Sequence, residues 1–323
     1  MKVLIIGGAG FLGSNLTRFC LRQPGVSVTV MDSLEPQLHA TTAHLAPVWK
    51  QIRFVRGSLL DDAMLAEVVQ DQDIIFNCAA QTSHPISIQN PLFDAEINCL
   101  GNLRLLENIR LLNGNAVVVY SSSSSVIGKA VTDVVDESHG EKPLEIYSAN
   151  KGVAEKYYRI YHRVHDLKTV VLRFSNLFGP YGKGWAEFGF INYFIHLARN
   201  NEEIRVYGDG AQTRNVLYAE DAAEALWIAA QTPALFGETY FAAHEEHHTV
   251  ADVAAGVVRV MGGGSVSHIP WPEDRKRIEI DRVLISGARL RSLTNWQPRH
   301  SLEEGLRKTR AILDGERSPP DHV

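Results

Sequence analysis

The first thirteen residues constrain the fold of this chain more than any other stretch. Lys2–Ile6 is a short apolar run with β-branched residues, long enough for a strand buried on both faces and too short for a helix. It leads into the segment Gly7-Gly8-Ala9-Gly10-Phe11-Leu12-Gly13. A glycine-rich turn between a buried strand and a helix lets the backbone approach a pyrophosphate, whose charge the first N–H groups of the helix bind. The segment predicts a dinucleotide cradle, and glycine spacings that begin at Gly7 or at Gly8 both fit.

The residues that follow supply the context that a glycine pattern alone lacks. Apolar residues recur at helical spacing as far as Cys20, Pro24-Gly25 ends this helix, and 26–31 has the pattern of a second strand. Asp32 stands at the end of that strand. A carboxylate about 20 positions beyond the glycines binds the ribose hydroxyls of NAD and repels the 2′-phosphate of NADP. The sequence therefore predicts NAD as the cofactor.

Composition excludes several classes of function. A net charge of −5 and a pI near 6.2 provide no basic surface for nucleic acid. Three scattered cysteines are too few for a disulfide framework or a thiolate metal site. The chain begins directly with a core strand, which leaves no room for a cleaved signal, and no apolar run is long enough to span a membrane. We expect a cytoplasmic protein without a nucleic-acid or membrane partner.

Strand-like and helix-like segments alternate through the first half of the chain. Further strands are expected at 52–57, 73–80, 116–120 and 169–174, and helices at 61–70, 92–112 and 147–165. This alternation predicts an α/β fold with a Rossmann-type, doubly wound parallel sheet. We expect an NAD-binding domain at 1–175, to which 211–235 returns, a smaller C-terminal α/β substrate domain at 176–315, and a flexible tail at 316–323.

Tyr147 and Lys151 lie four residues apart on an expected helix, so their side chains share one face. A lysine ammonium there favours the phenolate and is expected to lower the pKa of Tyr147 from about 10 toward working pH, as a general base requires. The serine run Ser121–Ser125 ends a central strand beside the cradle, where open α/β sheets bind their ligands. A serine hydroxyl there can hydrogen-bond a substrate hydroxyl that is being oxidised. These features predict a catalytic site for hydride transfer.

At these residues the chain resembles the extended short-chain dehydrogenase/reductase family, and within it the nucleotide-sugar epimerase/dehydratase group of the UDP-glucose/galactose 4-epimerase type. The glycine segment matches the family's GxxGxxG cradle, which selects the spacing that begins at Gly7. Four further segments resemble family motifs: Tyr120–Gly128 (SS-x-x-VYG), Leu172–Pro180 (LRxxNxYGP), Tyr207–Tyr218 (GDGxQxRDFxYV) and Trp296–Gly305 (WxPxxSLEEG). The chain departs from the family's usual residues at Ser58, Ile127, Asn150 and Asn215.

The resemblance implies the residues of the site. Catalytic residues are expected to be Ser123, Tyr147 and Lys151. Expected to bind the cofactor, together with Tyr147 and Lys151, are Gly7, Gly10, Phe11, Leu12, Gly13, Asp32, Ser58, Leu59, Ala79, Ala80 and Asn98. Expected to bind the substrate are Thr82, Ser83, His84, Ser124, Ser125, Asn176, Arg214 and Arg275. The two arginines suit the pyrophosphate, although the neighbouring Arg277 leaves the choice of clamp open, and His84 is equally compatible with packing.

Ser124 and Ser125 indicate the subtype. In the family's 4,6-dehydratases an Asp and a Glu follow the catalytic hydroxyl, and serine cannot replace a carboxylate as the base that removes a carbon-bound proton. Elimination favours a UDP-hexose 4-epimerase, which oxidises C4 and returns the hydride to either face. The alternatives are a nucleotide-sugar 4-ketoreductase or dehydratase of the same family, and a non-catalytic NAD-binding regulator, which would not need the Ser123, Tyr147 and Lys151 set.

His244–His248 satisfies the zinc-protease pattern HExxH literally. That pattern binds zinc only on a helix, where the two histidines share a face. Here it follows a strand-like segment and precedes an expected helix start at Thr249-Val250, so we expect a turn and no metal site.

The helices expected at 92–112 and 147–165 are long enough to pair across a two-fold axis into a four-helix bundle, an arrangement frequent in the resembled family. We therefore expect a homodimer.

Overall fold

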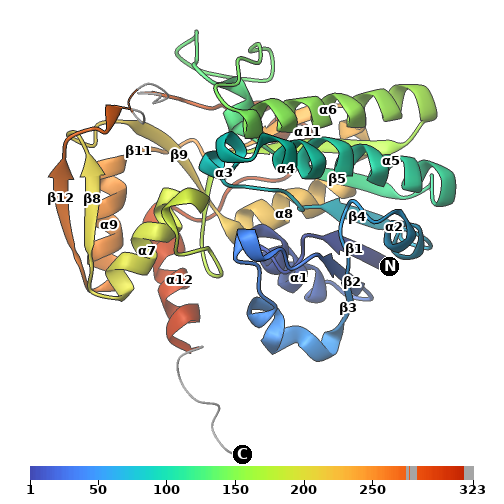
Figure 1. Cartoon of the computed structure of the whole chain (residues 1–323), viewed down its shortest axis with the longest axis horizontal. Helices are drawn as coiled ribbons and strands as arrows, with labels where there is room; N and C mark the ends of the chain where they lie inside the picture. Colours follow the sequence, from blue (N-terminus) through green and yellow to red (C-terminus); the bar gives the residue numbers. More distant parts are fainter. Residues whose placement is uncertain (274–275, 277–281, 316–323) are drawn as a thin grey trace, which may run out of the picture.

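The chain is built around a parallel sheet of seven strands, in the order β10-β6-β5-β4-β1-β2-β3 (Figure 1). The computed structural model describes residues 1–273, 276 and 282–315. The strands are β1 (Lys2–Ile6), β2 (Ser27–Asp32), β3 (Ile52–Arg56), β4 (Ile74–Asn77), β5 (Val117–Ser123), β6 (Lys168–Phe174) and β10 (Thr239–Ala242). The strand order reverses beside β1, so crossover helices lie on both faces. The predicted doubly wound sheet is confirmed.

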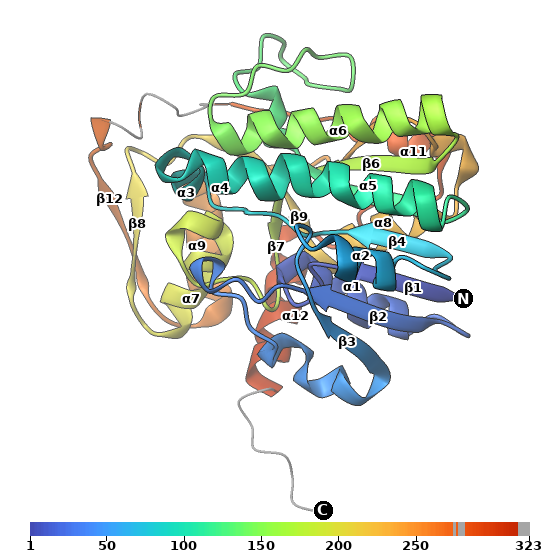
Figure 2. The same ribbon diagram turned by 45° about the vertical axis from the view of Figure 1, so that its right-hand side comes forward.

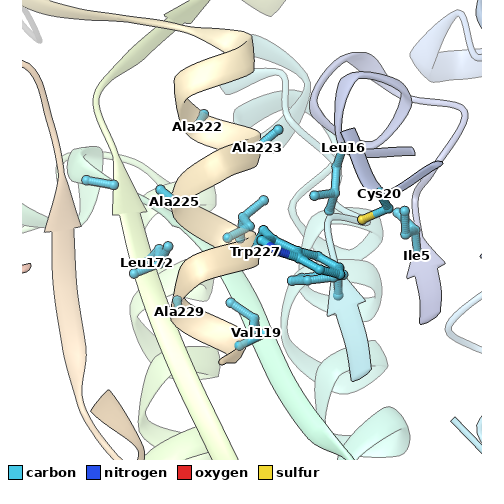
Figure 3. Packing of buried hydrophobic residues seen from close by; sticks show 14 of the residues in the cluster. Ile5, Leu16, Cys20, Val119, Leu172, Ala222, Ala223, Ala225, Trp227 and Ala229 are labelled. Atoms are coloured by element: carbon cyan, nitrogen blue, oxygen red, sulfur yellow. The ribbon is translucent and has the colours of Figure 1, made fainter. Parts of the chain in front are cut away.

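Side chains of β1 alternate between the two faces of the sheet. Val3 and Ile5 belong to the same core as α1 (Phe11–Leu21) and α8 (Ala219–Ala230) (Figure 3). Leu4 and Ile6 face α2 (Asp62–Val68), α5 (Gly101–Leu112) and α6 (Ile146–His165), with α5 and α6 side by side (Figure 2). All four side chains are fully buried, which explains why this strand is apolar on both faces.

Two strands end at residues other than those expected. β4 stops at Asn77, so Cys78, Ala79 and Ala80 belong to the following loop. β5 continues through Ser123, because its first three serines pair with β6 as far as the Ser123–Phe174 register position. The remaining serines, Ser124 and Ser125, start the short 3₁₀ helix η4 (Ser124–Ile127). The serine run therefore spans the end of a central strand and the turn beyond it.

The helix expected at 92–112 contains a π turn. After α3 (His84–Gln89), α4 (Pro91–Ala95) leads into η3 (Glu96–Leu100), a π-helical turn, and α5 continues from there. The turn holds the buried Asn98 side chain against the loop after β4. Asn98 Oδ1 accepts a hydrogen bond from Gln81 N (3.1 Å), and Asn98 Nδ2 donates one to Gln81 O (2.8 Å). The π turn thus fixes the loop that follows the carboxyl end of β4.

The chain beyond β6 forms two smaller sheets with their own helices (Figure 1, left). One sheet contains β7 (Asn176–Phe178), β9 (Thr213–Tyr218) and β11 (His247–Thr249), and the other β8 (Glu203–Tyr207) and β12 (Ser265–Ile269). α7 (Phe190–Arg199), α9 (Val250–Met261) and α12 (Leu302–Gly315) share a hydrophobic core with strands of both sheets. The short α11 (Ala288–Leu293) contacts β10.

Part of this later chain returns to the large sheet. α8 covers one face, and β10 then pairs in parallel with β6 as an edge strand. The segment expected to return to the NAD-binding domain was 211–235. In the structure the returning segment extends to Ala242, because β10 follows α8 and pairs with β6. The tail expected at 316–323 lies outside the described residues. Across the part of the chain that the structure describes, no helix is both long enough and apolar enough to cross a membrane.

Candidate active site

A cavity of about 330 Å³ lies at the carboxyl ends of β1, β2, β4, β5 and β6. This is the edge at which parallel α/β sheets bind ligands. Its lining includes sixteen of the residues expected from the sequence: Gly7, Gly10, Phe11, Leu12, Gly13, Asp32, Ser58, Leu59, Ala79, Ala80, Thr82, His84, Ser123, Tyr147, Lys151 and Asn176. The fold thus brings cradle, acid and catalytic candidates around one space.

The glycine turn has no room for side chains at two of its positions. Gly7 has a φ of 75°, and a Cβ atom there would lie 2.5 Å from the backbone N of Ala79. A Cβ on Gly13 would lie 2.2 Å from the carbonyl oxygen of Gly7. Gly10 caps α1 without a side-chain hydrogen bond, so no side chain covers the first N–H groups of the helix. This backbone fits the pyrophosphate of a dinucleotide.

Asp32 occupies the end of β2 beside this turn. Asp32 Oδ2 accepts a hydrogen bond from Ala9 N (3.0 Å) and Oδ1 accepts one from Leu34 N (2.9 Å). Burial raises the pKa of Asp32, while these backbone donors and the nearby Lys183 ammonium act in the opposite direction. The two backbone hydrogen bonds therefore hold the Asp32 carboxylate in the cavity wall.

Ser123, Tyr147 and Lys151 reach the cavity from two adjoining elements, the end of β5 and the first turns of α6. Ser123 Oγ accepts a hydrogen bond from Ser125 N (3.1 Å) and lies 2.9 Å from Ser125 Oγ. Lys151 Nζ donates to the Ser121 carbonyl oxygen (2.7 Å) and lies 4.2 Å from the centre of the Tyr120 ring. Tyr147 and Lys151 are only 8% and 2% exposed. These two side chains are shielded from bulk water, whereas Ser123 is partly exposed.

The pKa of Tyr147 differs from the expectation drawn from the sequence. Burial raises it above its ordinary value and the Glu145 carboxylate raises it further, whereas the Ser123 hydroxyl lowers it. Burial also lowers the pKa of Lys151, to about 8. The Lys151 ammonium donates to the Ser121 carbonyl oxygen, and the net effect of the surroundings is a raised pKa of Tyr147. Desolvation therefore outweighs the attraction expected between the two residues.

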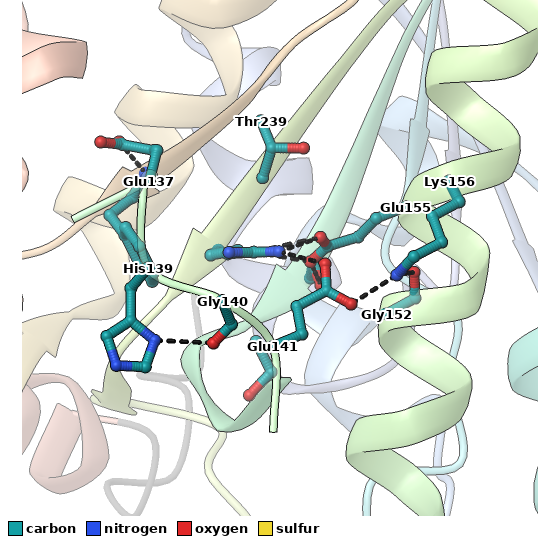
Figure 4. Close-up of polar contacts among 12 residues, drawn as sticks. Glu137, His139, Gly140, Glu141, Gly152, Glu155, Lys156 and Thr239 are labelled. Atoms are coloured by element: carbon teal, nitrogen blue, oxygen red, sulfur yellow. Dashed lines mark hydrogen bonds and ion pairs between the residues drawn. The ribbon is translucent and has the colours of Figure 1, made fainter. Parts of the chain in front are cut away.

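A buried ion-pair network joins β5, β6 and α6 next to this site (Figure 4). Arg173 donates to both Glu155 and Glu141, and Ser122 Oγ also donates to Glu155. Arg173 and Glu155 side chains are 6% and 2% exposed. Since Glu155 lies one turn beyond Lys151 on α6, the network fixes this helix against the end of the serine strand.

Other expected site residues do not line the cavity. Asn98 lies behind its wall, bonded to Gln81. Ser83 is fully buried and caps α3, accepting from Ile86 N. Ser124 and Ser125 lie in η4, and Arg214 lies on β9. Arg275 lies outside the described residues. Sequence spacing placed these side chains near the site but could not determine which way each one faces.

The HExxH segment is not helical. His244 to Glu246 precede β11, which begins at His247 and pairs with β9. His244 and His248 therefore do not share a helix face. A non-helical segment was expected from the sequence. Among the described residues, no group of three or more His, Cys, Asp or Glu side chains is arranged to hold a metal ion.

The segment 180–189, which is rich in glycine and aromatic residues, adds a further wall to the cavity. Lys183 and Phe188 line the cavity, with Lys183 Nζ 4.1 Å from the centre of the Phe188 ring. Burial lowers the pKa of Lys183 to about 8, and the Asp32 carboxylate opposes this. Trp185 stacks on His39, with ring centres 4.1 Å apart and planes 10° apart. The segment thus reaches across to the loop after β2.

Fold and site together define a dinucleotide-dependent enzyme of the Rossmann type, with serine, tyrosine and lysine at the end of its sheet. The chain belongs to the NAD dependent epimerase/dehydratase family, whose model matches residues 3–242. NAD is accordingly its cofactor, and the glycine turn, Asp32 and the cavity fit such a molecule.

Relatives within this family differ in activity. The chain is 29% identical over 314 residues to a UDP-glucose 4-epimerase of Mycolicibacterium smegmatis, covering 96% of this chain and 97% of that protein. It is 30% identical over 319 residues to a dTDP-glucose 4,6-dehydratase of Streptomyces niveus, covering 96% and 91%. The solved structure of a Thermus thermophilus UDP-glucose 4-epimerase in complex with NAD superimposes with a TM-score of 0.84 at 28% identity, covering 98% of this chain and 99% of that one.

Proposed function

We propose that this chain is a nucleotide-sugar 4-epimerase that acts on a UDP-hexose. The observation that carries the proposal is the joint placement of Ser123, Tyr147 and Lys151 in the cavity that also contains the glycine turn and Asp32. A UDP-glucose 4-epimerase among the relatives supports the substrate class. Because one relative is a dTDP-glucose 4,6-dehydratase, the deciding feature is that serines, not carboxylates, stand at positions 124 and 125.

The acids of the cavity support epimerisation over dehydration. Among the described lining residues only Asp32 and Glu35 carry carboxylates, and both belong to the end of β2 or the loop after it. Ser124 and Ser125 stand where a dehydratase of the resembled family has Asp and Glu. A hydride step and its reversal need one acid-base group at the C4 hydroxyl and no carboxylate next to it.

The proposed mechanism assigns a task to each residue. Bound NAD supplies the acceptor for the C4 hydride and later its donor. Tyr147 takes the proton of the C4 hydroxyl and afterwards returns it, and Ser123 hydrogen-bonds the same oxygen. Lys151, anchored on the Ser121 carbonyl, contributes positive charge near both. Burial of Tyr147 and Lys151 excludes water that would otherwise weaken their interactions.

We also propose a division of labour along the chain. Residues 1–175 and the returning α8 and β10 hold NAD, while 176–315 otherwise hold the nucleotide sugar. Asn176 faces the cavity and donates to Asn215 O (3.0 Å), which links β7 to β9, the strand that carries Arg214. A guanidinium on β9 suits the diphosphate of the substrate.

The proposal is tested with the purified protein and a panel of UDP-, dTDP-, CDP- and GDP-hexoses without added cofactor. We expect interconversion of C4 epimers, fastest with a UDP-hexose. Activity that requires stoichiometric NADH or NADPH would instead assign a 4-ketoreductase, and a 6-deoxy-4-keto product would assign a dehydratase. Either of these results would overturn the proposed epimerase.

A further inference from the structure

His84 is a titratable group of the cavity that the hydride mechanism does not use. It begins α3 directly after the loop that follows β4, and its side chain is 46% exposed and lines the cavity. Its ring centre lies 4.9 Å from that of Tyr147, with the planes tilted by 47°. His84 therefore lies against the residue that is proposed to act on the C4 hydroxyl.

Glu145 orients this histidine from the other side. His84 Nδ1 lies 3.1 Å from Glu145 Oε1, and the Glu145 side chain is only 7% exposed. Because Nδ1 is engaged with the carboxylate, Nε2 is the nitrogen left for the cavity. A buried carboxylate, an imidazole and an open Nε2 form the arrangement that enzymes use for general bases.

The carboxylate is itself held firmly. Glu145 caps α6 by accepting hydrogen bonds from Ser148 N (3.2 Å) and from the Ser148 hydroxyl, and its Oε2 accepts one from Ser87 Oγ (3.2 Å). Burial would raise the pKa of Glu145, but His84 and Ser148 together hold it below its ordinary value. Glu145 is thus an ionised partner fixed two residues before Tyr147.

We infer that His84, oriented by Glu145, is a second acid-base residue of this site, which exchanges a proton on a carbon adjacent to the C4 ketone. The inference rests on the proposed function, which creates that ketone. His84 Nε2 takes the proton from C3 or C5, the C–H bond breaks, and its electron pair forms an enolate whose oxygen accepts hydrogen bonds from Ser123 and Tyr147. Return of the proton to the same carbon restores the ketone, with no net oxidation or reduction.

In this step His84 acts as the base that removes a carbon-bound proton, a role that Ser124 and Ser125 cannot perform. Protons next to a ketone are acidic enough for a histidine to remove, and the resulting imidazolium is stabilised by the adjacent carboxylate. Reprotonation on the opposite face would invert C3 or C5. The site would thereby gain an activity that hydride transfer alone does not provide.

The experiment uses a ready-made ketone, UDP-4-keto-6-deoxyglucose, incubated with the full chain in D₂O and analysed by mass spectrometry and proton NMR. We expect deuterium at C3 or C5 to appear at least about tenfold faster than without protein. This readout does not require the hydride step, so its failure is distinguishable from failure of the proposed epimerase. Deuterium incorporation at the protein-free rate would overturn the inference even if C4 epimers interconvert.

Two variants and a control identify the groups. His84→Asn should slow the exchange about 100-fold, and free imidazole in the buffer should restore part of it, which no structural role of His84 would explain. Glu145→Gln keeps an oxygen that can cap α6 but loses the charge, and should slow the exchange at least tenfold. The control Ser292→Ala, at an exposed residue of α11 outside the cavity lining, should leave the exchange within about twofold of the wild type. Equal exchange in wild type and His84→Asn would refute the role of His84.

Discussion

At the scale of single residues, burial raises the pKa of the Tyr147 hydroxyl above its ordinary value. The Glu145 carboxylate raises this pKa further, and the hydrogen bond of the Ser123 hydroxyl lowers it. Tyr147→Phe removes only the hydroxyl and leaves the cavity wall in place. We expect turnover to fall at least about 10³-fold while NAD binding changes little, measured by epimerisation rate and by calorimetry with NAD. Retention of most activity would exclude Tyr147 as the acid-base group.

Lys151 gives a prediction for pH. Its folded-state pKa of about 8 is lower than the ordinary 10.5, so between these values the unfolded chain binds a proton that the folded chain does not. The free energy of unfolding of the ligand-free wild type should therefore rise with pH across this window. Lys151→Met has no proton to lose, so the stability of the wild type relative to this variant should increase from pH 8 to pH 10.5. Urea unfolding of both proteins tests this, and a difference independent of pH would contradict the depressed pKa.

Sequence reasoning succeeded for residues whose role follows from the backbone. Gly7 and Gly13 are required because a Cβ would collide with main-chain atoms, and a glycine pattern after a strand signals such crowding. Glu145 and Lys183 were missed, because each acquires its position through a partner distant along the chain, His84 or Asp32. The expected effect of Lys151 on Tyr147 was wrong for a related reason. Helical spacing brings two side chains to one face but does not report desolvation or a competing carbonyl.

At the scale of elements, segment 180–189 joins two distant parts of the cavity. Its Pro180 carbonyl accepts a hydrogen bond from Asn15 on α1 (3.0 Å), and its Tyr181 ring lies 3.9 Å from the Arg18 guanidinium. Trp185 then stacks on His39. Because Lys183 and Phe188 of the same segment line the cavity together with Asp32, we expect these contacts to slow the release of NAD.

Trp185→Ala should therefore speed the release of NAD. Loss of an aromatic stack of about 0.5–1.5 kcal/mol predicts dissociation about two- to tenfold faster, measured by stopped-flow displacement. Trp49→Ala is the matched control, since Trp49 is 44% exposed against 45% for Trp185 and packs on Phe54 instead. Equal rates of NAD release in the two variants would show that segment 180–189 does not slow the dissociation of NAD.

Elements were predictable in type but not always in extent. The sheet strands and α6 follow from apolar runs and helical spacing. The π turn at Glu96–Leu100 was not predicted, because the spacing of apolar residues through 92–112 is compatible with an ordinary helix. What the π turn accommodates is Asn98, whose amide bonds to a loop that periodicity does not describe.

At the scale of the whole molecule, the helices α4, α5 and α6 present apolar side chains to solvent. Leu92, Leu100 and Leu111 are 76%, 50% and 66% exposed, and Ile160 and Val164, one turn apart on α6, are 51% and 62% exposed. α5 and α6 lie side by side, so this surface is continuous enough to pair with a copy of itself (Figure 2). We expect a homodimer formed through these helices.

The double variant Ile160→Glu with Val164→Glu should convert this dimer to a monomer, because four buried carboxylates would face one another across a two-fold axis. Light scattering after size-exclusion chromatography measures the change. Leu293→Glu, at a residue that is 43% exposed on α11, should leave the mass unchanged. A wild type that runs as a monomer would refute the expected assembly.

In the proposed epimerase, the hydrogen on C4 of the sugar leaves as a hydride and returns to the same carbon. UDP-glucose labelled with deuterium at C4, incubated with the protein and no added NAD or NADH, tests this. We predict UDP-galactose that keeps the deuterium at C4. A UDP-galactose product that has lost this deuterium to water, or the absence of any C4 epimer from every nucleotide hexose tried, would contradict it.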